Sequence, residues 1–231
     1  MAYRDKHVVI TGGTGALGGA VVAALLDAGA VCHVPYIHEE EAERFQHRRH
    51  ERVTLIATAS LADEGAVARL YDGIAPLWAS IHIAGGFAMA PIADTDKAAL
   101  TAQLEMNLVS CFLCCRAAVG AMKGKGGRIV NVASRPALES RLGAGMTAYT
   151  VAKAGVAALT EALAQEVIGD DILVNAIAPS IMDTPTNRKD MPKANFALWP
   201  KVEEVAATIL FLASPENKLT RGAVVPVYGK S

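Results

Sequence analysis

The sequence predicts an α/β fold built on a doubly wound parallel sheet of about seven strands, with helices on both faces. Short apolar runs alternate with longer amphipathic stretches along the whole chain of 231 residues, and this alternation is typical of β-α units. Apolar residues make up 52% of the chain and aromatic residues only 5%, which suits helices packed closely on a sheet. We expect a single domain over residues 1–231, because this length is ordinary for one α/β core.

The predicted elements follow one another in a regular order of strand and helix. Parallel strands need crossover connections, and these connections place helices on the faces of the sheet. In such a sheet ligands bind beyond the carboxyl ends of the strands, so the loops after the strands should carry the site. The expected strands cover residues 8–10, 31–34, 53–57, 81–84, 129–132, 172–177 and 224–227. The expected helices cover residues 17–28, 39–50, 64–75, 96–122, 149–167 and 202–212.

Charge and composition exclude several classes of partner. The formal net charge is -1, with acidic and basic residues interspersed, so no broad basic surface is present to collect nucleic acid or anionic lipid. No stretch is expected to be long and uncharged enough to span a membrane, and the charged segment 1–7 lacks the order of a secretory signal. We expect a cytoplasmic protein with no nucleic-acid or membrane partner.

The four cysteines are predicted to be small buried side chains. Cys111, Cys114 and Cys115 share one face of a predicted helix, and Cys32 lies in a predicted strand. A disulfide is not expected in a reducing compartment. The helical spacing is able to hold a metal, but no histidine or aspartate accompanies it within the same segment. No metal site is therefore predicted.

A glycine-rich turn joins the first predicted strand to the first predicted helix. Glycines let backbone N–H groups approach a pyrophosphate closely, and the start of a helix adds a partial positive charge. This position in the chain predicts dinucleotide binding, and a P-loop is excluded because no Lys-Ser or Lys-Thr pair follows the last glycine. The expected cofactor contacts in the turn are Gly12, Thr14, Gly15, Ala16, Leu17 and Gly18.

The end of the second predicted strand indicates which nicotinamide cofactor binds. An acidic residue there is typical of NAD and a basic residue of NADP, but the segment Tyr36-Ile37-His38 carries neither. The missing carboxylate removes repulsion against a 2'-phosphate, and His38 is able to donate to such a group. We expect NAD(P) as the cofactor, with a preference for NADP, bound in part by these three residues.

Tyr149 and Lys153 are the candidate acid-base pair. They are four residues apart on a predicted helix, so their side chains share one face. A nearby ammonium group favours the phenolate and lowers the pKa of a tyrosine. Ser134 follows the predicted strand 129–132, where a ligand is expected, and its hydroxyl is able to hold a carbonyl oxygen as charge develops.

These residues, taken together, resemble the short-chain dehydrogenase/reductase family over essentially the whole chain. Ala84-Gly85-Gly86, Asn107, the run from Gly127 to Ser134, and Tyr149-x-x-x-Lys153 match landmarks of the family in order and spacing. The resemblance implies a Rossmann-type fold and hydride transfer between a nicotinamide and a small carbonyl or alcohol substrate, including 3-oxoacyl-reductase-like chemistry. It also implies further cofactor contacts at Ser60, Leu61, Ala84, Gly85, Gly86, Tyr149, Lys153, Pro179, Ile181 and Thr184.

The resemblance implies a role for each member of the candidate catalytic set. Tyr149 would be the general acid in carbonyl reduction, and Ser134 would position the substrate oxygen. Lys153 would lower the pKa of the tyrosine and hold the nicotinamide ribose, and Asn107 would anchor a water of a proton relay. Protein groups thus supply orientation and proton transfer.

The sequence departs from the family pattern at several cofactor positions. Ala16 replaces the usual middle glycine, and the spacing of Gly12, Gly15 and Gly18 is that of the sugar-modifying branch. His82 and Ile83 replace the usual pair of asparagines. Ser60 takes the place of the usual aspartate, and Ser180 takes that of a glycine after Pro179. These changes concern cofactor preference and fine geometry, not the reaction class.

A predicted substrate lid covers residues 182–200. Segments 13–18, 84–87 and 183–192 resemble dihydropteridine reductases, although that enzyme type lacks the serine present here as Ser134. A dihydropteridine-reductase-like activity is therefore an alternative, and the lid is otherwise a packed loop without a role in specificity. Arg135 and Arg141 are either solvated or able to meet an anionic group of a substrate.

Two further alternatives belong to other functional classes. The changed cofactor positions His82, Ile83 and Ser60 are compatible with a non-catalytic NAD(P)-binding sensor or scaffold. The glycine spacing is also compatible with a sugar-nucleotide epimerase, but the chain is short for the extra substrate domain of that branch. The apolar helical stretches 101–122 and 149–167 predict a homodimer or homotetramer.

Overall fold

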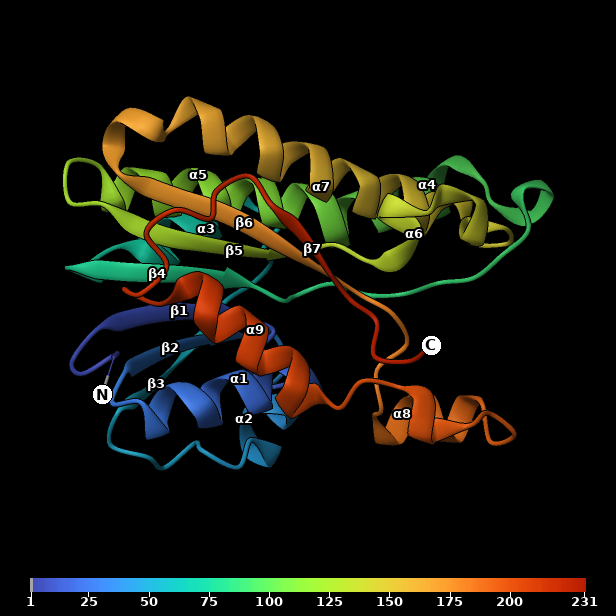
Figure 1. The fold of residues 1–231 in the computed structure, drawn as a ribbon, viewed down its shortest axis with the longest axis horizontal. Helices are drawn as coiled ribbons and strands as arrows, with labels where there is room; N and C mark the ends of the chain where they lie inside the picture. Colours follow the sequence, from blue (N-terminus) through green and yellow to red (C-terminus); the bar gives the residue numbers. More distant parts are fainter. Residues whose placement is uncertain (1) are drawn as a thin grey trace.

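The computed structural model describes residues 2–231 and contains a seven-stranded sheet whose paired strands are all parallel (Figure 1). The strands stand in the order β3-β2-β1-β4-β5-β6-β7, so the direction of winding reverses between β1 and β4. This arrangement confirms the predicted α/β, Rossmann-type doubly wound sheet. The strands are β1 (His7–Thr11), β2 (Val31–Tyr36), β3 (Val53–Ala57), β4 (Leu77–His82), β5 (Gly127–Val132), β6 (Ile172–Pro179) and β7 (Val224–Val227).

Helices cover both faces of the sheet (Figure 1). α1, α2 and α9 lie on one face, and α3, α5 and α7 on the other, while α8 stands apart near the end of β6. The helices are α1 (Ala16–Asp27), α2 (Glu39–Arg44), α3 (Glu64–Tyr71), α4 (Lys97–Leu104), α5 (Ser110–Met122), α6 (Arg135–Leu138), α7 (Thr147–Glu166), α8 (Pro185–Asp190) and α9 (Val202–Ala213).

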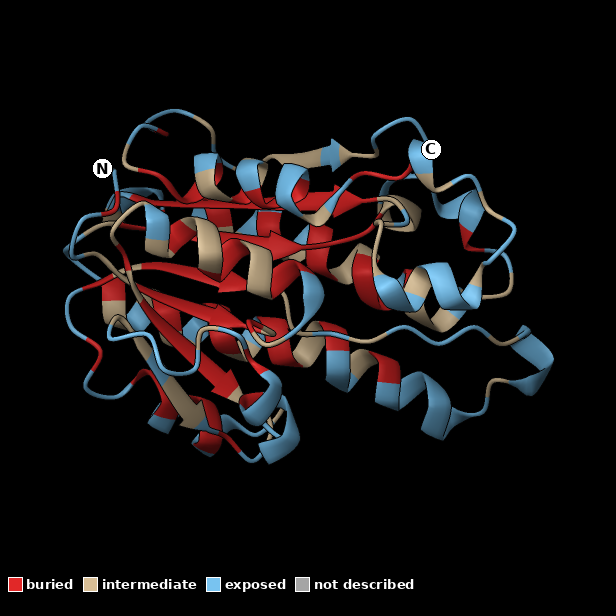
Figure 2. Cartoon of the chain, turned by 90° about the horizontal axis from the view of Figure 1, so that it is seen from below, coloured by how far each residue is buried: buried red, intermediate tan, exposed pale blue. Residues whose placement is uncertain are grey.

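The sheet separates two apolar cores, and its central strands are buried throughout (Figure 2). Under α1 and α9 the core is aliphatic, with Val21, Leu25 and Ile209 fully buried. Under α5 and α7 it includes Cys114 and Met122. Burial of each side chain of this size stabilises the folded state by roughly 1.5–3 kcal/mol. The strands that carry the site are therefore held by a well-packed core on both faces.

Three predicted elements have the wrong bounds, and one of them is the helix expected at 64–75, which ends at Tyr71. The helix expected at 39–50 ends at Arg44, because Phe45 turns into extended backbone and buries its ring, while the charged residues 46–50 offer no apolar face. The strand expected at 81–84 begins at Leu77 and ends at His82. The strand includes the polar Ser80, whose buried hydroxyl is bonded to Tyr71 and His82, and these contacts are not visible in the local pattern.

The long helix expected at 96–122 is interrupted by a π-turn. α4 and α5 are joined by the π-helical segment η2 (Glu105–Val109), which inserts one wide turn into the run. Such turns are frequent at functional sites because they redirect a side chain. Here the turn contains Asn107, a member of the candidate catalytic set.

The same run, Lys97–Met122, is the one helical stretch within residues 2–231 that is long and apolar enough to cross a membrane by length and hydropathy. The expectation that no segment meets this test is therefore wrong. In the fold, α5 packs Cys115, Ala118 and Met122 against the sheet. One face of the run is thus packed on the sheet, and 33% of its most apolar window is buried.

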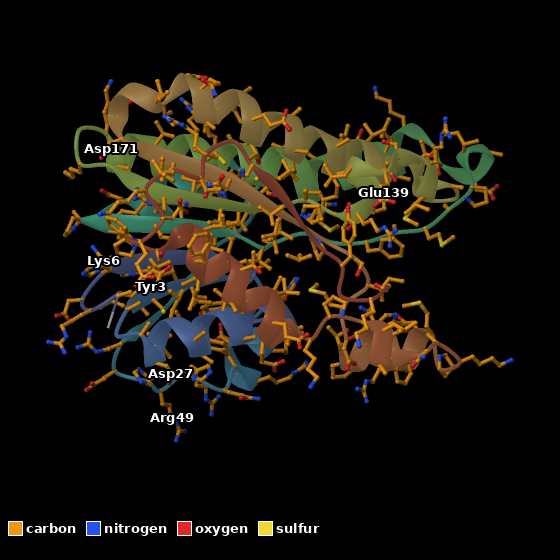
Figure 3. The ribbon with its side chains drawn as sticks, in the orientation of Figure 1. Tyr3, Lys6, Asp27, Arg49, Glu139 and Asp171 are labelled. Carbon is orange, nitrogen blue, oxygen red and sulfur yellow. The ribbon has the colours of Figure 1, made fainter. Side chains whose placement is uncertain are left out.

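The carboxyl ends of the strands meet at one end of the molecule. Figure 3 shows Asp171, which precedes β6, at the opposite end from Glu139, which follows the short α6 beyond β5. The loops after β1, β4, β5 and β6 therefore converge at the end marked by Glu139. Arg49, from the charged segment 46–52, lies on the outer surface beside α2 (Figure 3).

Candidate active site

The glycine-rich turn after β1 is packed too tightly for side chains, against backbone atoms at Gly12 and Gly18 and against the Val34 side chain at Gly13. Gly12 has a φ of +68°, and a Cβ there would lie 2.7 Å from the Ala84 nitrogen. A Cβ at Gly18 would collide with the carbonyl oxygen of Gly12. The turn is thus folded back onto both the start of α1 and the loop after β4, and it leaves a backbone cradle of the kind that accepts a pyrophosphate.

The start of α1 is free to bind an anion. Its N-cap, Gly15, provides no side-chain hydrogen bond, and no acidic residue lies in the first turn. The first N–H groups of a helix lack partners within the helix and carry a partial positive charge. Gly15 and Ala16 are exposed, Thr14 is half-buried, and Leu17 and Gly18 are buried, so the residues present fit a dinucleotide at this position.

The residues expected to contact the adenosine end of the cofactor are largely exposed. Tyr36 ends β2 half-buried, and Ile37 is 49% exposed. His38 is the N-cap of α2 but makes no side-chain cap bond there. Glu41, in the first turn of α2, accepts a weak hydrogen bond from Thr14 (3.4 Å). The structure thus places an acidic side chain beside the phosphate-binding turn, which the sequence pattern did not indicate.

The remaining cofactor positions lie on neighbouring loops. The Ser60 hydroxyl accepts a hydrogen bond from the Ala62 nitrogen (3.1 Å), and Leu61 is buried. The Ala84 nitrogen donates to the Thr11 hydroxyl (3.3 Å), which ties the loop after β4 to the end of β1. Gly85 and Gly86 follow directly and face the π-turn.

Asn107 holds the loop after β4 in place. Its amide nitrogen donates to the Gly86 oxygen (3.0 Å) and the Gln103 oxygen (3.1 Å), and its amide oxygen accepts from the Gly86 nitrogen (3.2 Å). The side chain is 1% exposed. Its polar atoms are therefore already used to position Gly86, and the expected role in anchoring a relay water stays a prediction.

Lys153 is buried at the junction of α7, β5 and the loop after β4. Its ammonium group donates to the Val132 oxygen (2.8 Å), and a Cβ at Gly85 would lie 3.4 Å from it and 2.6 Å from the Asn107 amide oxygen. Burial lowers the pKa of Lys153 to about 8, against an opposing effect of Cys111. The fold thus brings Gly85, Asn107 and Lys153 together.

Ser134 and Tyr149 face each other across the end of β5. The Ser134 hydroxyl is buried and makes no regular hydrogen bond with any group in residues 2–231, yet it lies near enough to Tyr149 to lower the pKa of the phenol. A buried hydroxyl without a partner is costly and indicates a site for a polar ligand atom. A substrate oxygen fits this position.

The ionisation of Tyr149 differs from the expectation. Burial raises the pKa of the phenol, and the neighbouring Ser134 offsets only part of this effect. The lowering expected from Lys153 does not appear in the free chain, where the ammonium group is bonded to the Val132 oxygen. Tyr149 is therefore protonated at neutral pH, as a proton donor must be.

The predicted lid, residues 182–200, is held by an ion pair and hydrogen bonds within the segment and by contacts between its two ends. Asp183 pairs with Lys201 as an isolated β-bridge, its nitrogen donates to the Pro200 oxygen (2.9 Å), and its carboxylate forms a bidentate ion pair with Arg188 (2.5 and 2.7 Å). The Thr184 hydroxyl caps α8 by accepting from Asn187. Pro179 ends β6, and Ile181 is 44% exposed at the start of the segment.

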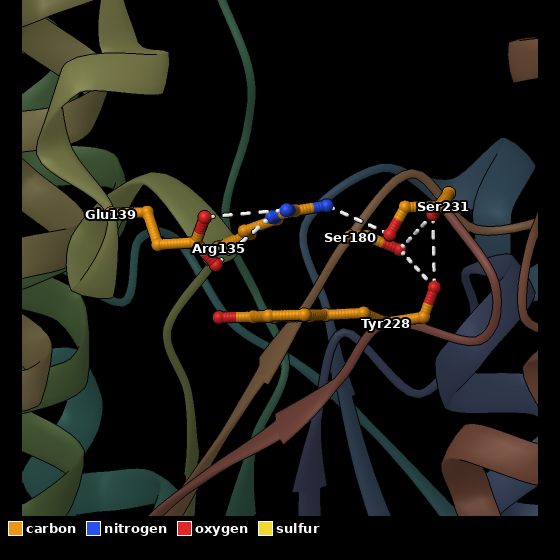
Figure 4. Close-up of polar contacts among 5 residues, drawn as sticks. All are labelled: Arg135, Glu139, Ser180, Tyr228 and Ser231. Carbon is orange, nitrogen blue, oxygen red and sulfur yellow. Dashed lines mark hydrogen bonds and ion pairs between the residues drawn. The ribbon is translucent and has the colours of Figure 1, made fainter.

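The C-terminal residues are bonded to Arg135 after β5 and to Ser180 after β6 (Figure 4). Arg135 donates to the Ser231 oxygen (2.7 Å), pairs with Glu139 and lies over the Tyr228 ring at 4.6 Å. Ser180 bonds to the Ser231 hydroxyl (2.7 Å) and the Tyr228 oxygen (2.9 Å). Arg135 is thus engaged by the protein itself and is not free for a substrate anion, whereas Arg141 is exposed.

Sequence reasoning missed Phe87 as a neighbour of Tyr149. The two rings meet edge to face, with centroids 5.1 Å apart, and Phe87 is 61% exposed. Met89 lies in the same loop and approaches Gly145 across the mouth of the site. No periodic pattern marks these residues, because they lie in an irregular loop.

A family model described as short chain dehydrogenase matches residues 6–195. The chain belongs to the short-chain dehydrogenase/reductase family. Within this family, galactitol 2-dehydrogenase of Rhizobium johnstonii is 34% identical, with 98% of this chain and 97% of that protein covered. The cis-4-hydroxycyclohexanecarboxylate dehydrogenase of Sinomonas cyclohexanicum is 32% identical, with 99% and 97% covered.

Solved structures of the family share the whole fold. A metagenomic blue fluorescent protein in complex with NADPH is 25% identical, with a TM-score of 0.89 and coverage of 100% of this chain and 99% of that chain. The family, the fold and the dehydrogenase relatives together make this short-chain dehydrogenase/reductase an NAD(P)-dependent oxidoreductase that acts on an alcohol or carbonyl group. A dihydropteridine reductase or a non-catalytic sensor is not favoured.

Proposed function

We propose that this enzyme interconverts a ketone and a secondary alcohol, with Tyr149 as the proton donor for reduction. The observation that carries the proposal is the Tyr149 phenol beside the buried Ser134 hydroxyl, which has no hydrogen-bond partner within residues 2–231. Two hydroxyl donors on one carbonyl oxygen stabilise the negative charge that develops there when hydride reaches the carbon. The bound nicotinamide supplies that hydride, and Tyr149 supplies the proton that completes the alcohol.

The other members of the set act through position and charge. Lys153 Nζ is fixed by the Val132 oxygen and lies beside Gly85, where a nicotinamide ribose is expected. Its positive charge favours the phenolate that remains after proton transfer. Asn107 is a positioning residue, because its hydrogen bonds to the Gly86 backbone hold the loop after β4 beside Lys153.

NADP is the proposed preferred cofactor. Tyr36, Ile37 and His38 at the end of β2 carry no carboxylate for a ribose 2'-hydroxyl, and His38 is exposed at the start of α2. The carboxylate of Glu41 nearby accepts a hydrogen bond from Thr14 instead. The NADPH-bound relative of the same fold supports this assignment. The proposed contacts are those predicted: the turn Gly12–Gly18, Tyr36–His38, Ser60 and Leu61, Ala84–Gly86, and Pro179, Ile181 and Thr184.

The mouth of the site favours a substrate with an apolar body. Phe87, Met89 and Ile181 are 61%, 65% and 44% exposed around the loops that border Tyr149, and apolar side chains of this size prefer to be covered. One relative is named for cis-4-hydroxycyclohexanecarboxylate, an alicyclic alcohol. We therefore propose alicyclic or branched ketones and alcohols ahead of open-chain polyols.

The segment 182–200 is the proposed lid of a single domain that covers residues 1–231. Its two ends meet at Asp183 and Lys201, so the segment projects as one unit, and the ring of Phe196 packs on Trp199 (5.0 Å). A segment whose two ends lie side by side is able to move as a whole and close over a bound substrate. Limited proteolysis within the segment should slow when cofactor and substrate are added together.

A cytoplasmic homodimer or homotetramer without nucleic-acid or membrane partners is the proposed assembly. Met106, Phe112 and Val151 are 45%, 51% and 50% exposed on the outer side of η2, α5 and α7, and exposed apolar helix faces of this kind form isologous interfaces. Light scattering after size exclusion should give an even multiple of the chain mass.

The proposed activity is tested by a cofactor titration followed by a ketone panel. Fluorescence titration with NADPH and NADH identifies the better ligand. That ligand is then supplied with cyclic, branched and linear ketones, and its oxidised form with the matching alcohols. We expect saturable binding of NADPH and oxidation of NADPH with at least one cyclic ketone. Saturable binding together with no turnover on the whole panel, in either direction, would overturn the proposal in favour of a sensor.

A further inference from the structure

A second cluster of chemically reactive side chains lies behind the active site, under α5. His82 on β4 and Cys111 and Cys115 on α5 bring three donor atoms within 4.8 Å of one another, and all three residues are buried. The sequence showed the two thiols at helical spacing but no further ligand nearby. The fold supplies it, because β4 runs beneath α5 and carries His82 at its end.

A fourth donor completes the cluster. The Asn131 amide oxygen on β5 lies 2.8 Å from His82 Nδ1 and 3.5 Å from Cys115 Sγ, and that Sγ lies 3.5 Å from His82 Nδ1. Zinc bonds of about 2.3 Å to sulfur and about 2.0–2.1 Å to nitrogen or oxygen give a tetrahedron with edges of roughly 3.4–3.8 Å. The two contacts of the Cys115 sulfur already have this length, and the His82–Asn131 contact would have to open slightly.

Neighbouring hydrogen bonds orient the donors toward a common point. His82 Nε2 is held by the Ser80 hydroxyl (2.8 Å) and the Tyr71 hydroxyl (3.3 Å), which leaves Nδ1 facing Cys115 and Asn131. The Asn131 amide nitrogen donates to Thr160 Oγ1 (2.9 Å), which turns its oxygen toward His82. Partners of this kind fix the ring and amide orientation in metal sites.

We propose that His82 Nδ1, Cys111 Sγ, Cys115 Sγ and the Asn131 amide oxygen bind one Zn²⁺ or a similar soft divalent cation in a closed structural site. Two thiolates balance the charge of the cation, and the two thiol protons pass to solvent when it binds. A neutral, four-coordinate complex suits a buried position. The ion would tie α5 to β4 and β5.

The experiment measures metal content in protein expressed with zinc or cobalt in the medium, purified under reducing conditions without chelators or a histidine tag. We expect about one metal per chain and, with cobalt, sulfur-to-cobalt charge-transfer bands together with tetrahedral d–d bands. His82→Asn restores the residue usual in the family, so this variant should fold and yet retain below about a tenth of the metal. Cys111→Ala should do the same.

Cys114→Ala is the matched control, because Cys114 is buried on the same helix and contacts Tyr71 but supplies none of the four donor atoms. This variant should keep the metal and the cobalt spectrum. Metal-free wild-type protein from both media would overturn the proposal. So would metal that persists in folded His82→Asn, or cobalt bound without charge-transfer bands.

Discussion

The catalytic residues and the residues expected to contact the adenosine differ in how firmly their side chains are held. At the catalytic end Asn107, Ser134 and Lys153 are 1%, 4% and 5% exposed, and two of them are fixed by hydrogen bonds to backbone groups. At the adenosine end Ile37 and His38 are exposed, and His38 makes no cap bond. Proton transfer thus depends on side chains that are buried and fixed by the fold. The choice between NADH and NADPH depends on exposed side chains, which can be replaced by mutation without disturbing the fold.

Replacement of Lys153 should give the largest loss at the fixed end. Lys153→Met keeps the length of the side chain but removes the charge and the bond to the Val132 oxygen, so ketone reduction should fall by at least about a hundredfold. Steady-state rates with saturating NADPH measure this loss. The exposed Lys125→Met serves as control, and equal rates for the two variants would remove Lys153 from the mechanism.

Gly18→Ala should disrupt the phosphate-binding turn. Its Cβ would collide with the Gly12 oxygen, so the turn must open, at a cost of about 1–3 kcal/mol in the free energy of unfolding, and NADPH affinity should fall with it. The adjacent Gly19→Ala meets nothing within 4 Å and is the matched control. Denaturant unfolding and NADPH titration on both variants compare them, and unchanged values for Gly18→Ala would contradict the tight packing of the turn.

Burial of Lys153 should make the stability of the protein depend on alkaline pH. The pKa of Lys153 is about 8 in the folded chain, against an ordinary lysine value of 10.5, so the unfolded chain binds the extra proton between these values. Stability should therefore rise with pH across that window, on the order of 3 kcal/mol, relative to Lys153→Met. Urea unfolding of both proteins at several pH values measures the difference. If the free energies of unfolding of the two proteins changed with pH in parallel, Lys153 would not be desolvated in the folded chain.

Changes at the open end should be the smallest and should affect cofactor choice alone. His38→Ala should weaken NADPH relative to NADH by a few-fold, and Glu41→Gln should strengthen NADPH by a similar factor, since exposed charges contribute only about 0.2–1 kcal/mol. Glu40→Gln is the control for Glu41. Ratios of the two dissociation constants test this, and a change in turnover with either variant would contradict the separation of the two ends.

The sequence was sufficient for the features that rest on local geometry. Glycines between a strand and a helix, and a tyrosine and lysine one helical turn apart, follow from spacing alone, and their positions in the fold match the family resemblance. The limit of helix α2 was missed because the burial of Phe45 depends on the rest of the core. The charged residues and the helical periodicity of residues 39–50 gave no sign that the helix ends at Arg44.

Features that join distant segments were not accessible to sequence reasoning. The cluster of His82, Cys111 and Cys115 forms only when β4 is placed beneath α5. The engagement of Arg135 by Ser231 joins residues 96 positions apart, and the lowering of the Tyr149 pKa expected from Lys153 is replaced by a rise due to burial. In each case tertiary packing decided the outcome.

The most direct test of the account compares cofactor binding with ketone reduction in Tyr149→Phe. The variant removes only the phenol oxygen, so NADPH affinity should match the wild type while reduction falls by roughly 10²–10⁴-fold. Tyr3→Phe, at a buried tyrosine far from the site (Figure 3), should retain the wild-type rate. Wild-type turnover by Tyr149→Phe would show that another group donates the proton and would contradict the account.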